Sequence, residues 1–277
     1  MSDPRWVLYG KLPWNREFLR VGVVSGPGAK LREWIDTGFD PSLFEGATKP
    51  SATLGRFSFA ADPKTELRGV IRMSEDARGR KFPCAVARVA PLTERVSEWA
   101  GAEELYEKAR GETDLAALEE LCATFEEPKQ SGAGPRIEDW RKFASQVFEE
   151  DGEYLFTKAL WRLRHWKLAG EPEMAFHCPI GGLGREGVAA WLSVFESLGG
   201  GPEAWRVAQA SARAVRIARG GAEDELRTLL GGKSLRSRVA NLEDFEAKVP
   251  TEGFREFCRA VSDDGGASLE GLVSLLG

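Results

Sequence analysis

A glycine-rich segment in the second half of the chain is the clearest formal motif for binding a cofactor. Gly182, Gly184 and Gly187 fit the spacing G-x-G-x-x-G. The segment follows a predicted strand and precedes a predicted helix, an order that can place a phosphate at a helix N-terminus. A dinucleotide-binding fold normally begins with this unit, and its expected acidic residue would be Glu203, which follows a Gly-Pro pair rather than a strand. We therefore interpret 182–187 as a strand-to-helix loop, with a nucleotide-binding module or enzyme as the alternative.

Other candidate chemistry is incomplete. Gly232, Lys233 and Ser234 fit the end of a phosphate-binding loop, but Arg227 stands where that motif requires glycine. The neighbouring residues His177-Cys178 lie on a predicted strand and would point to opposite faces, so they are poorly placed to share one metal ion. The sequence has no G-x-S-x-G motif and only two histidines. We expect a protein that is not an enzyme, with no catalytic residues, cofactor or metal.

A basic and aromatic segment, WRLRHWK at 161–167, has the composition of a nucleic-acid contact. Phe156, Leu160, Leu163 and Lys167 share one stripe of the predicted helix, however, which places the arginines at its solvent-exposed flanks. The net charge of the chain is −5, with both signs spread along the sequence. We therefore expect no nucleic-acid partner.

The composition is that of a folded cytoplasmic protein. The chain has 277 residues, and 42% of them are hydrophobic, which is enough for a sizeable core. Four scattered cysteines without a C-x-x-C pair indicate reduced thiols. The N-terminal residues lack the apolar segment of a signal peptide, and no stretch approaches the 18 apolar residues of a membrane span. We expect a cytoplasmic location.

The order of predicted elements indicates an α+β fold, with an N-terminal, mainly antiparallel sheet and flanking helices followed by a helix-rich half. The predicted strands are 5–12, 18–25, 53–60, 67–75 and 82–90, with further strands at 173–180 and 204–210. The predicted helices are 28–39, 93–110, 114–126, 137–168 with a break near 151–152, and 187–198; the chain from 212 onward is expected to be mostly helix. We expect a bulge at Gly55 and N-caps at Thr93 and Asp114.

The polar segment RMSEDARGRKFP, at 72–83, is predicted to form the tip of a hairpin between two apolar strands. On physical grounds it is a solvated loop, with an exposed Asp76–Arg80 pair worth about 0–1 kcal/mol. A polar loop on a rigid sheet can also be a recognition surface.

Two segments together resemble the signature of the TagF/ImpM family of type VI secretion-associated proteins: YGKLPWNREFLR at 9–20 and GVIRMSEDARGRKFPCAVA at 69–87. The first segment matches the family pattern GKLPxxGDF, and the second matches its Pro-Ser-x-Asp-x-x-Gly-Arg-x-Phe-Pro loop. The chain departs from the family at Arg16-Glu17, where the family has Gly-Asp, and at Met73-Ser74, where it has Pro-Ser. The family-motif residues are Gly10, Lys11, Leu12, Pro13, Glu17, Phe18, Asp76, Arg78, Gly79, Arg80, Phe82 and Pro83.

The resemblance implies an adaptor that restrains type VI secretion after translation, by binding a forkhead-associated-domain scaffold protein. It covers about the first ninety residues and implies a TagF-like α+β region at 1–125, while 137–277 forms a helix-rich region, either separate or packed with the first. The motif residues would then form a partner-binding surface. A structural component of the secretion machine is a further alternative. The resemblance predicts that Lys11 and Arg80 lie on the same side of the domain.

Overall fold

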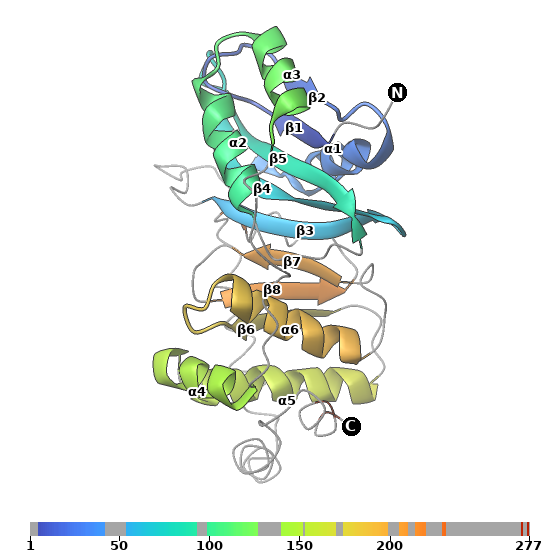
Figure 1. The fold of residues 1–277 in the computed structure, drawn as a ribbon, viewed down its shortest axis with the longest axis vertical. Coiled ribbons are helices and arrows are strands. Elements are labelled where there is room, and N and C mark those ends of the chain that lie inside the picture. The colour runs from blue at the N-terminus through green and yellow to red at the C-terminus, as the bar shows by residue number, and fades with distance from the viewer. Residues whose placement is uncertain are drawn as a thin grey trace. The chain divides into compact units, whose positions relative to one another are not determined.

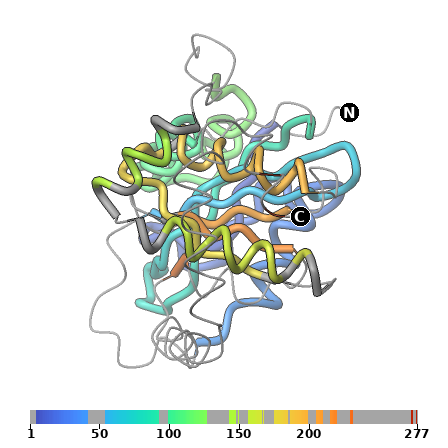
Figure 2. Tube along the Cα trace, turned by 90° about the horizontal axis from the view of Figure 1, so that it is seen from below, coloured from blue at the N-terminus to red at the C-terminus, as the bar shows by residue number. Residues whose placement is uncertain are grey.

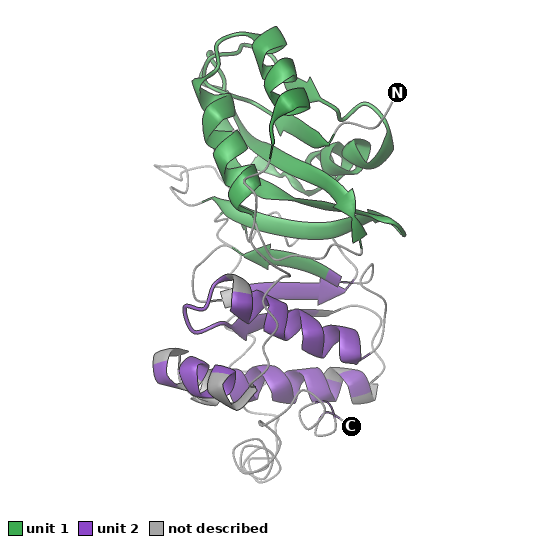
Figure 3. Ribbon diagram, viewed as in Figure 1, with its two compact units in different colours: residues 1–132, 206–210, 221–233 green, residues 133–205, 211–220, 234–277 purple. Residues whose placement is uncertain are grey.

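A computed structural model describes residues 5–41, 54–92, 99–126, 140–151, 153–169, 174–198, 205–209, 214–219, 229–230, 273 and 276. These residues form strands and helices of an α+β protein (Figure 1). The chain divides into two compact units, and Figure 2 traces the chain through both. Unit 1 comprises residues 1–132, 206–210 and 221–233, and unit 2 comprises 133–205, 211–220 and 234–277 (Figure 3).

Unit 1 is built on an antiparallel sheet with the strand order β2-β1-β5-β4-β3-β7. Its strands are β1 (Trp6–Gly10), β2 (Leu19–Val21), β3 (Gly55–Asp62), β4 (Thr65–Glu75), β5 (Lys81–Pro91) and residues 206–209 of β7 (Trp205–Gln209). β3, β4 and β5 form the predicted meander, in which each strand pairs with the next. β1 pairs with both β2 and β5, so the two family-motif segments lie on neighbouring strands.

Helices cover both faces of this sheet. α1 (Gly26–Gly38) packs Leu31, Trp34 and Ile35 onto one face, against side chains that include Phe57 and Phe59. These helix residues recur at i, i+3 and i+4, so the predicted amphipathic helix is confirmed. α2 (Ala100–Gly111) and α3 (Leu115–Thr124) contact the sheet as well. The opposite face carries Trp6 of β1, whose ring meets Phe125 at the end of α3.

The described residues of unit 2 form three helices and a strand pair. α4 (Trp140–Asp151) and α5 (Glu153–Ala169) are separate helices, and α5 contacts β6 (Met174–Pro179). β6 pairs antiparallel with β8 (Ala214–Arg219), and α6 (Arg185–Ser197) follows β6 after a short loop. The helices pack on one another, on β6 and on Trp205 through aromatic contacts at ring-centroid distances between 4.8 and 5.8 Å. The rings involved are those of Phe143, Phe156, Phe176, Trp191, Phe195 and Trp205.

Two local predictions are wrong. The bulge expected at Gly55 is absent, because β3 begins at Gly55 and Leu54 therefore does not have to fit the strand alternation; the register shift lies between Ala60 and Asp62. Residues 214–219, expected to be helical, form β8. Residues 215–218 are all buried, and Val215 and Ile217 recur with the two-residue period of a strand.

Two N-cap predictions have different outcomes. Asp114 caps α3, because its carboxylate accepts a hydrogen bond of 3.1 Å from the backbone N–H of Ala116. Thr93 lies outside the described residues, as do Lys233 and Cys258.

Candidate functional site

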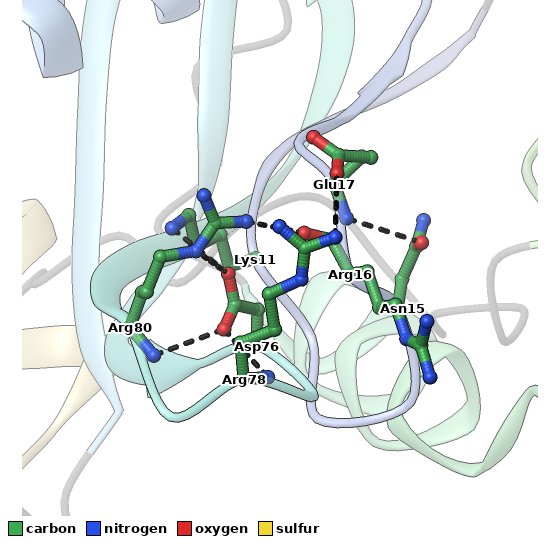
Figure 4. A network of polar contacts seen from close by, with 7 residues as sticks. All are labelled: Lys11, Asn15, Arg16, Glu17, Asp76, Arg78 and Arg80. Carbon is green, nitrogen blue, oxygen red and sulfur yellow. Dashed lines mark hydrogen bonds and ion pairs between the residues drawn. The ribbon is translucent and has the colours of Figure 1, made fainter.

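The two family-motif segments meet at a buried carboxylate. Lys11, which follows β1, donates a hydrogen bond of 3.0 Å from Nζ to Oδ2 of Asp76, at the end of β4. Arg80 donates from Nε to the same oxygen at 2.7 Å. Figure 4 shows these side chains converging on Asp76 from the two segments. Lys11 and Arg80 therefore lie on the same side of the domain, as the sequence predicts.

Asp76 also organises the hairpin loop between β4 and β5. Its Oδ1 accepts hydrogen bonds of 2.9 Å from the backbone N–H groups of Arg78 and Arg80. The Asp76 carbonyl accepts a bond of 2.8 Å from Gly79, whose φ of 75° lies in the left-handed region. The N–H of Asp76 also donates a hydrogen bond of 3.1 Å to the Arg80 carbonyl, which leaves residues 77–79 as the loop. A three-residue loop that ends in a left-handed glycine is a common hairpin connection. One carboxylate thus holds both the charged side chains and the backbone of the loop.

The turn after Lys11 is joined to this loop through its backbone. The Asn15 carbonyl accepts a hydrogen bond of 2.9 Å from the N–H of Ala77. Arg80 Nη2 donates a hydrogen bond to the Arg16 carbonyl. The Asn15 side chain accepts from the N–H of Glu17 at 3.3 Å. Sequence matching missed Asn15 and the Arg16 carbonyl, although asparagine in a turn is a recognised signal for such backbone bonds.

Aromatic rings pack against one another beside these polar contacts. Phe18, from the first segment, and Phe82, from the second, make an edge-to-face contact with ring centroids 4.8 Å apart. Phe39 contacts Phe82 at 5.0 Å, and Lys11 Nζ lies 4.8 Å from the centre of the Phe18 ring. Aromatic and cation–π contacts of this geometry favour one arrangement of the two segments. We call the joined residues Lys11, Asn15, Arg16, Phe18, Asp76, Arg80 and Phe82 the clamp.

Gly10 allows β1 to approach β5. It ends β1, as the resemblance implies, and its φ is 136°. A Cβ atom at this position would lie 2.1 Å from the carbonyl oxygen of Pro83 and 2.6 Å from Cα of Cys84. The absence of a side chain at Gly10 therefore leaves the space that the Pro83 carbonyl oxygen occupies.

The structure separates the motif residues into a buried and an exposed set. Gly10, Lys11, Leu12, Asp76 and Pro83 are buried, Phe18 and Phe82 are half-buried, and Pro13, Glu17, Arg78, Gly79 and Arg80 are exposed. The Asp76 side chain has no exposed surface, so the predictions of a solvent-exposed Asp76–Arg80 pair and of an Asp76 contribution to the charged surface are wrong. Its carboxylate turns inward because its hydrogen-bond donors are Lys11, the Arg80 side chain and the backbone of the loop. Among the motif residues, the exposed charged side chains are those of Glu17, Arg78 and Arg80.

The environment of Asp76 lowers its pKa. Burial raises the pKa of this carboxyl. Four hydrogen bonds lower the pKa by more, and their donors are the backbone N–H of Arg80, the Lys11 side chain, the backbone N–H of Arg78 and the Arg80 side chain. The net pKa lies well below the ordinary value of 3.8. The carboxylate is therefore ionised at any pH near neutrality.

A pH dependence of stability follows from this shift. Because the folded pKa is below the unfolded one, ionised Asp76 stabilises the fold fully above about pH 5 and progressively less below about pH 4. We expect Asp76→Asn to lose less unfolding free energy than the wild type between about pH 6 and pH 3. Urea titrations at several pH values measure this difference. Parallel pH profiles for the two proteins would contradict the assignment.

The glycine loop of unit 2 has the predicted strand–loop–helix order, but its sheet context differs from a dinucleotide site. β6 pairs antiparallel with β8, whereas the dinucleotide motif belongs to a parallel βαβ unit. Gly182 and Gly184 have φ values of 66° and 52°. At Gly187 a Cβ would lie 2.5 Å from Cβ of Ile180, so this glycine permits close packing of α6 on the loop. The conformation and packing of the loop account for its glycines without a ligand.

We therefore expect no nucleotide effect on stability. A nucleotide present at about 100 times its dissociation constant would add about 2.7 kcal/mol. Thermal unfolding with millimolar ATP, GTP or NAD should give the same midpoint as the protein alone. A clear rise with any one of them, lost in Gly184→Val, would revive the nucleotide-binding alternative.

The other candidate groups that the structure describes do not assemble into a site. His177 is exposed and Cys178 is buried on β6, as the strand alternation predicts. Within the described residues, no group of three or more His, Cys, Asp or Glu side chains is placed to hold a metal ion. Cys84, Cys122 and Cys178 are buried free thiols, and burial raises the pKa of each. Of the helices described, none has the length and apolar character needed to cross a membrane.

Comparisons with known proteins give little further information. No family model matches the sequence, and no curated protein matches it. Among solved structures, the crystal structure of PA0076 from Pseudomonas aeruginosa PAO1 is similar, with 23% sequence identity and a TM-score of 0.32. That match covers 48% of this chain and 66% of PA0076, just under two thirds of its length. None of these comparisons assigns a family to the chain.

Proposed function

We propose that the chain is a cytoplasmic adaptor of the TagF/ImpM type, which represses a type VI secretion machine by binding its forkhead-associated-domain scaffold protein. The observation that supports this most is the meeting of the two resembling segments in one clamp. Their matched residues contact one another: Lys11 and Arg80 bind Asp76, Phe18 meets Phe82, and Gly10 faces Pro83. The residues that carry the resemblance therefore form one set of contacts in the fold, which supports the resemblance on which this proposal depends.

The clamp supplies a rigid base for an exposed loop, which suits protein binding. Arg78 and Glu17 have side-chain exposures of 55% and 71%, so both can reach a partner. The backbone of Arg78 is fixed by Asp76 at 2.9 Å. A loop that is held in its bound conformation loses less entropy on association, which favours affinity. The buried residues Lys11 and Asp76 are in this proposal positioning residues.

Direct binding tests the proposal. Purified chain and the forkhead-associated-domain scaffold of a type VI system should form a complex, measured by isothermal titration calorimetry. Arg78→Glu should weaken it at least tenfold, because charge reversal at an interface adds repulsion to the lost contact. Arg110→Glu, at an exposed arginine of α2 paired with Glu107, is the matched control and should have little effect. Equal affinities for wild type and Arg78→Glu would remove this loop from the interface.

A further inference from the structure

Two guanidinium groups of the clamp region lie beside one short backbone stretch. Arg80 Nη2 donates to the carbonyl oxygen of Arg16, and Arg78 Nη2 lies 3.9 Å from Oε1 of Glu17. Residues 16 and 17 are consecutive, so the two arginines contact neighbouring residues, Arg80 through the backbone of Arg16 and Arg78 through the side chain of Glu17 (Figure 4). We call Arg78, Arg80 and the Glu17 carboxylate next to them the arginine rim.

The two arginines of the rim are held to different degrees. Arg80 is anchored by its Nε on the buried Asp76 and by its Nη2 on Arg16, while 46% of its side chain stays exposed. Among the described residues, no acceptor is bonded to its Nη1. The Arg78–Glu17 pair, by contrast, is long at 3.9 Å and exposed on both sides. Such a pair is weak and readily exchanged for a better one.

The local charge is positive although the whole chain carries −5. Segments 16–17 and 75–81 expose four cations against two acids: Arg16, Arg78, Arg80 and Lys81 against Glu17 and Glu75. A compact positive patch on an acidic protein attracts a short acidic segment, while the overall negative charge opposes a long polyanion such as nucleic acid. Guanidinium groups also match carboxylates in a two-point geometry.

We propose that the arginine rim binds an acidic segment of a protein partner, and that Glu17 occupies the place of the incoming carboxylate until it is displaced. This inference rests on the proposed function, because it takes the partner to be a protein. It adds that the partner segment bound at the arginine rim is acidic. Glu17 then lowers affinity by competing for Arg78. If Glu17 is substituted, this arrangement predicts a higher affinity. An arrangement in which Glu17 itself contacts a basic partner predicts a lower affinity.

A hexaglutamate peptide with a fluorescent label is the probe, read by anisotropy against the full chain at low salt. We expect Glu17→Gln to bind the peptide about threefold more tightly and Arg78→Gln about fivefold more weakly. Glu107→Gln, which removes an exposed acid paired to Arg110 on α2, is the control and should leave affinity unchanged. Binding should fall as salt rises.

Three outcomes overturn the inference. They are no binding of hexaglutamate to the wild type, weaker or unchanged binding by Glu17→Gln, and tighter binding of a single-stranded oligonucleotide of equal charge. The scaffold protein is titrated in parallel with the same variants. Scaffold binding without hexaglutamate binding overturns the acidic-segment inference alone, and hexaglutamate binding without scaffold binding overturns the proposed function alone.

Discussion

Gly10→Ala is expected to destabilise the protein by about 3 to 5 kcal/mol. The methyl group would lie 2.1 Å from the Pro83 carbonyl oxygen, and alanine would also have to adopt a φ of 136°. Gly10 is paired with Leu19 on one side and Cys84 on the other, so the strand cannot shift without breaking a ladder. Urea unfolding at neutral pH measures the loss.

Gly79→Ala is the matched control for this substitution. Gly79 also has a positive φ, of 75°, but a Cβ there would meet no atom within 4 Å. Its cost should be limited to the backbone conformation, about 1 kcal/mol. If Gly10→Ala loses no more stability than Gly79→Ala, the close approach of β1 and β5 is not what requires glycine.

Lys11→Met is expected to destabilise the protein by about 2 kcal/mol. Methionine keeps most of the length of the lysine stem but removes the charged donor that lies 3.0 Å from Asp76 Oδ2. The lysine side chain is only 5% exposed, so water cannot readily replace the lost bond. The ammonium group above the Phe18 ring is lost as well. Denaturant unfolding followed by tryptophan fluorescence gives the change.

Lys108→Met provides the comparison for Lys11→Met. Lys108 pairs with Glu104 one helical turn away on α2, and its side chain is 50% exposed. An exposed pair of this kind contributes about 0.3–0.5 kcal/mol. Similar losses at the two lysines would mean that the buried ion pair of the clamp contributes no more than a surface pair.

The sequence predicts the elements of unit 1 well because their periods are clear. Leu31, Trp34 and Ile35 mark one helical face, and the apolar runs of β4 and β5 are bounded by a polar loop. β8 is missed because its alternation covers only Val215 and Ile217 between arginines and alanines. Whether a short segment forms a strand depends on the strand that it pairs with, which is β6 for β8. The sequence of residues 214–219 alone does not reveal that partner.

The candidate site is predicted in composition but not in burial. Motif matching names Lys11, Asp76 and Arg80, and it places them together. It also treats Asp76 as a surface group, because a polar hairpin tip normally faces solvent. The carboxylate is buried because Lys11 reaches it from another strand, and a contact 65 positions apart has no local signal.

The most direct test of the account is scaffold binding by Asp76→Asn. Asp76 is buried and cannot touch a partner, yet its charge holds Lys11 and Arg80 in place. The account predicts that the wild-type chain binds the forkhead-associated-domain scaffold in calorimetry, and that Asp76→Asn binds at least fivefold more weakly with an unchanged circular dichroism spectrum. A wild-type chain that does not bind, or a folded Asp76→Asn protein with wild-type affinity, would contradict it.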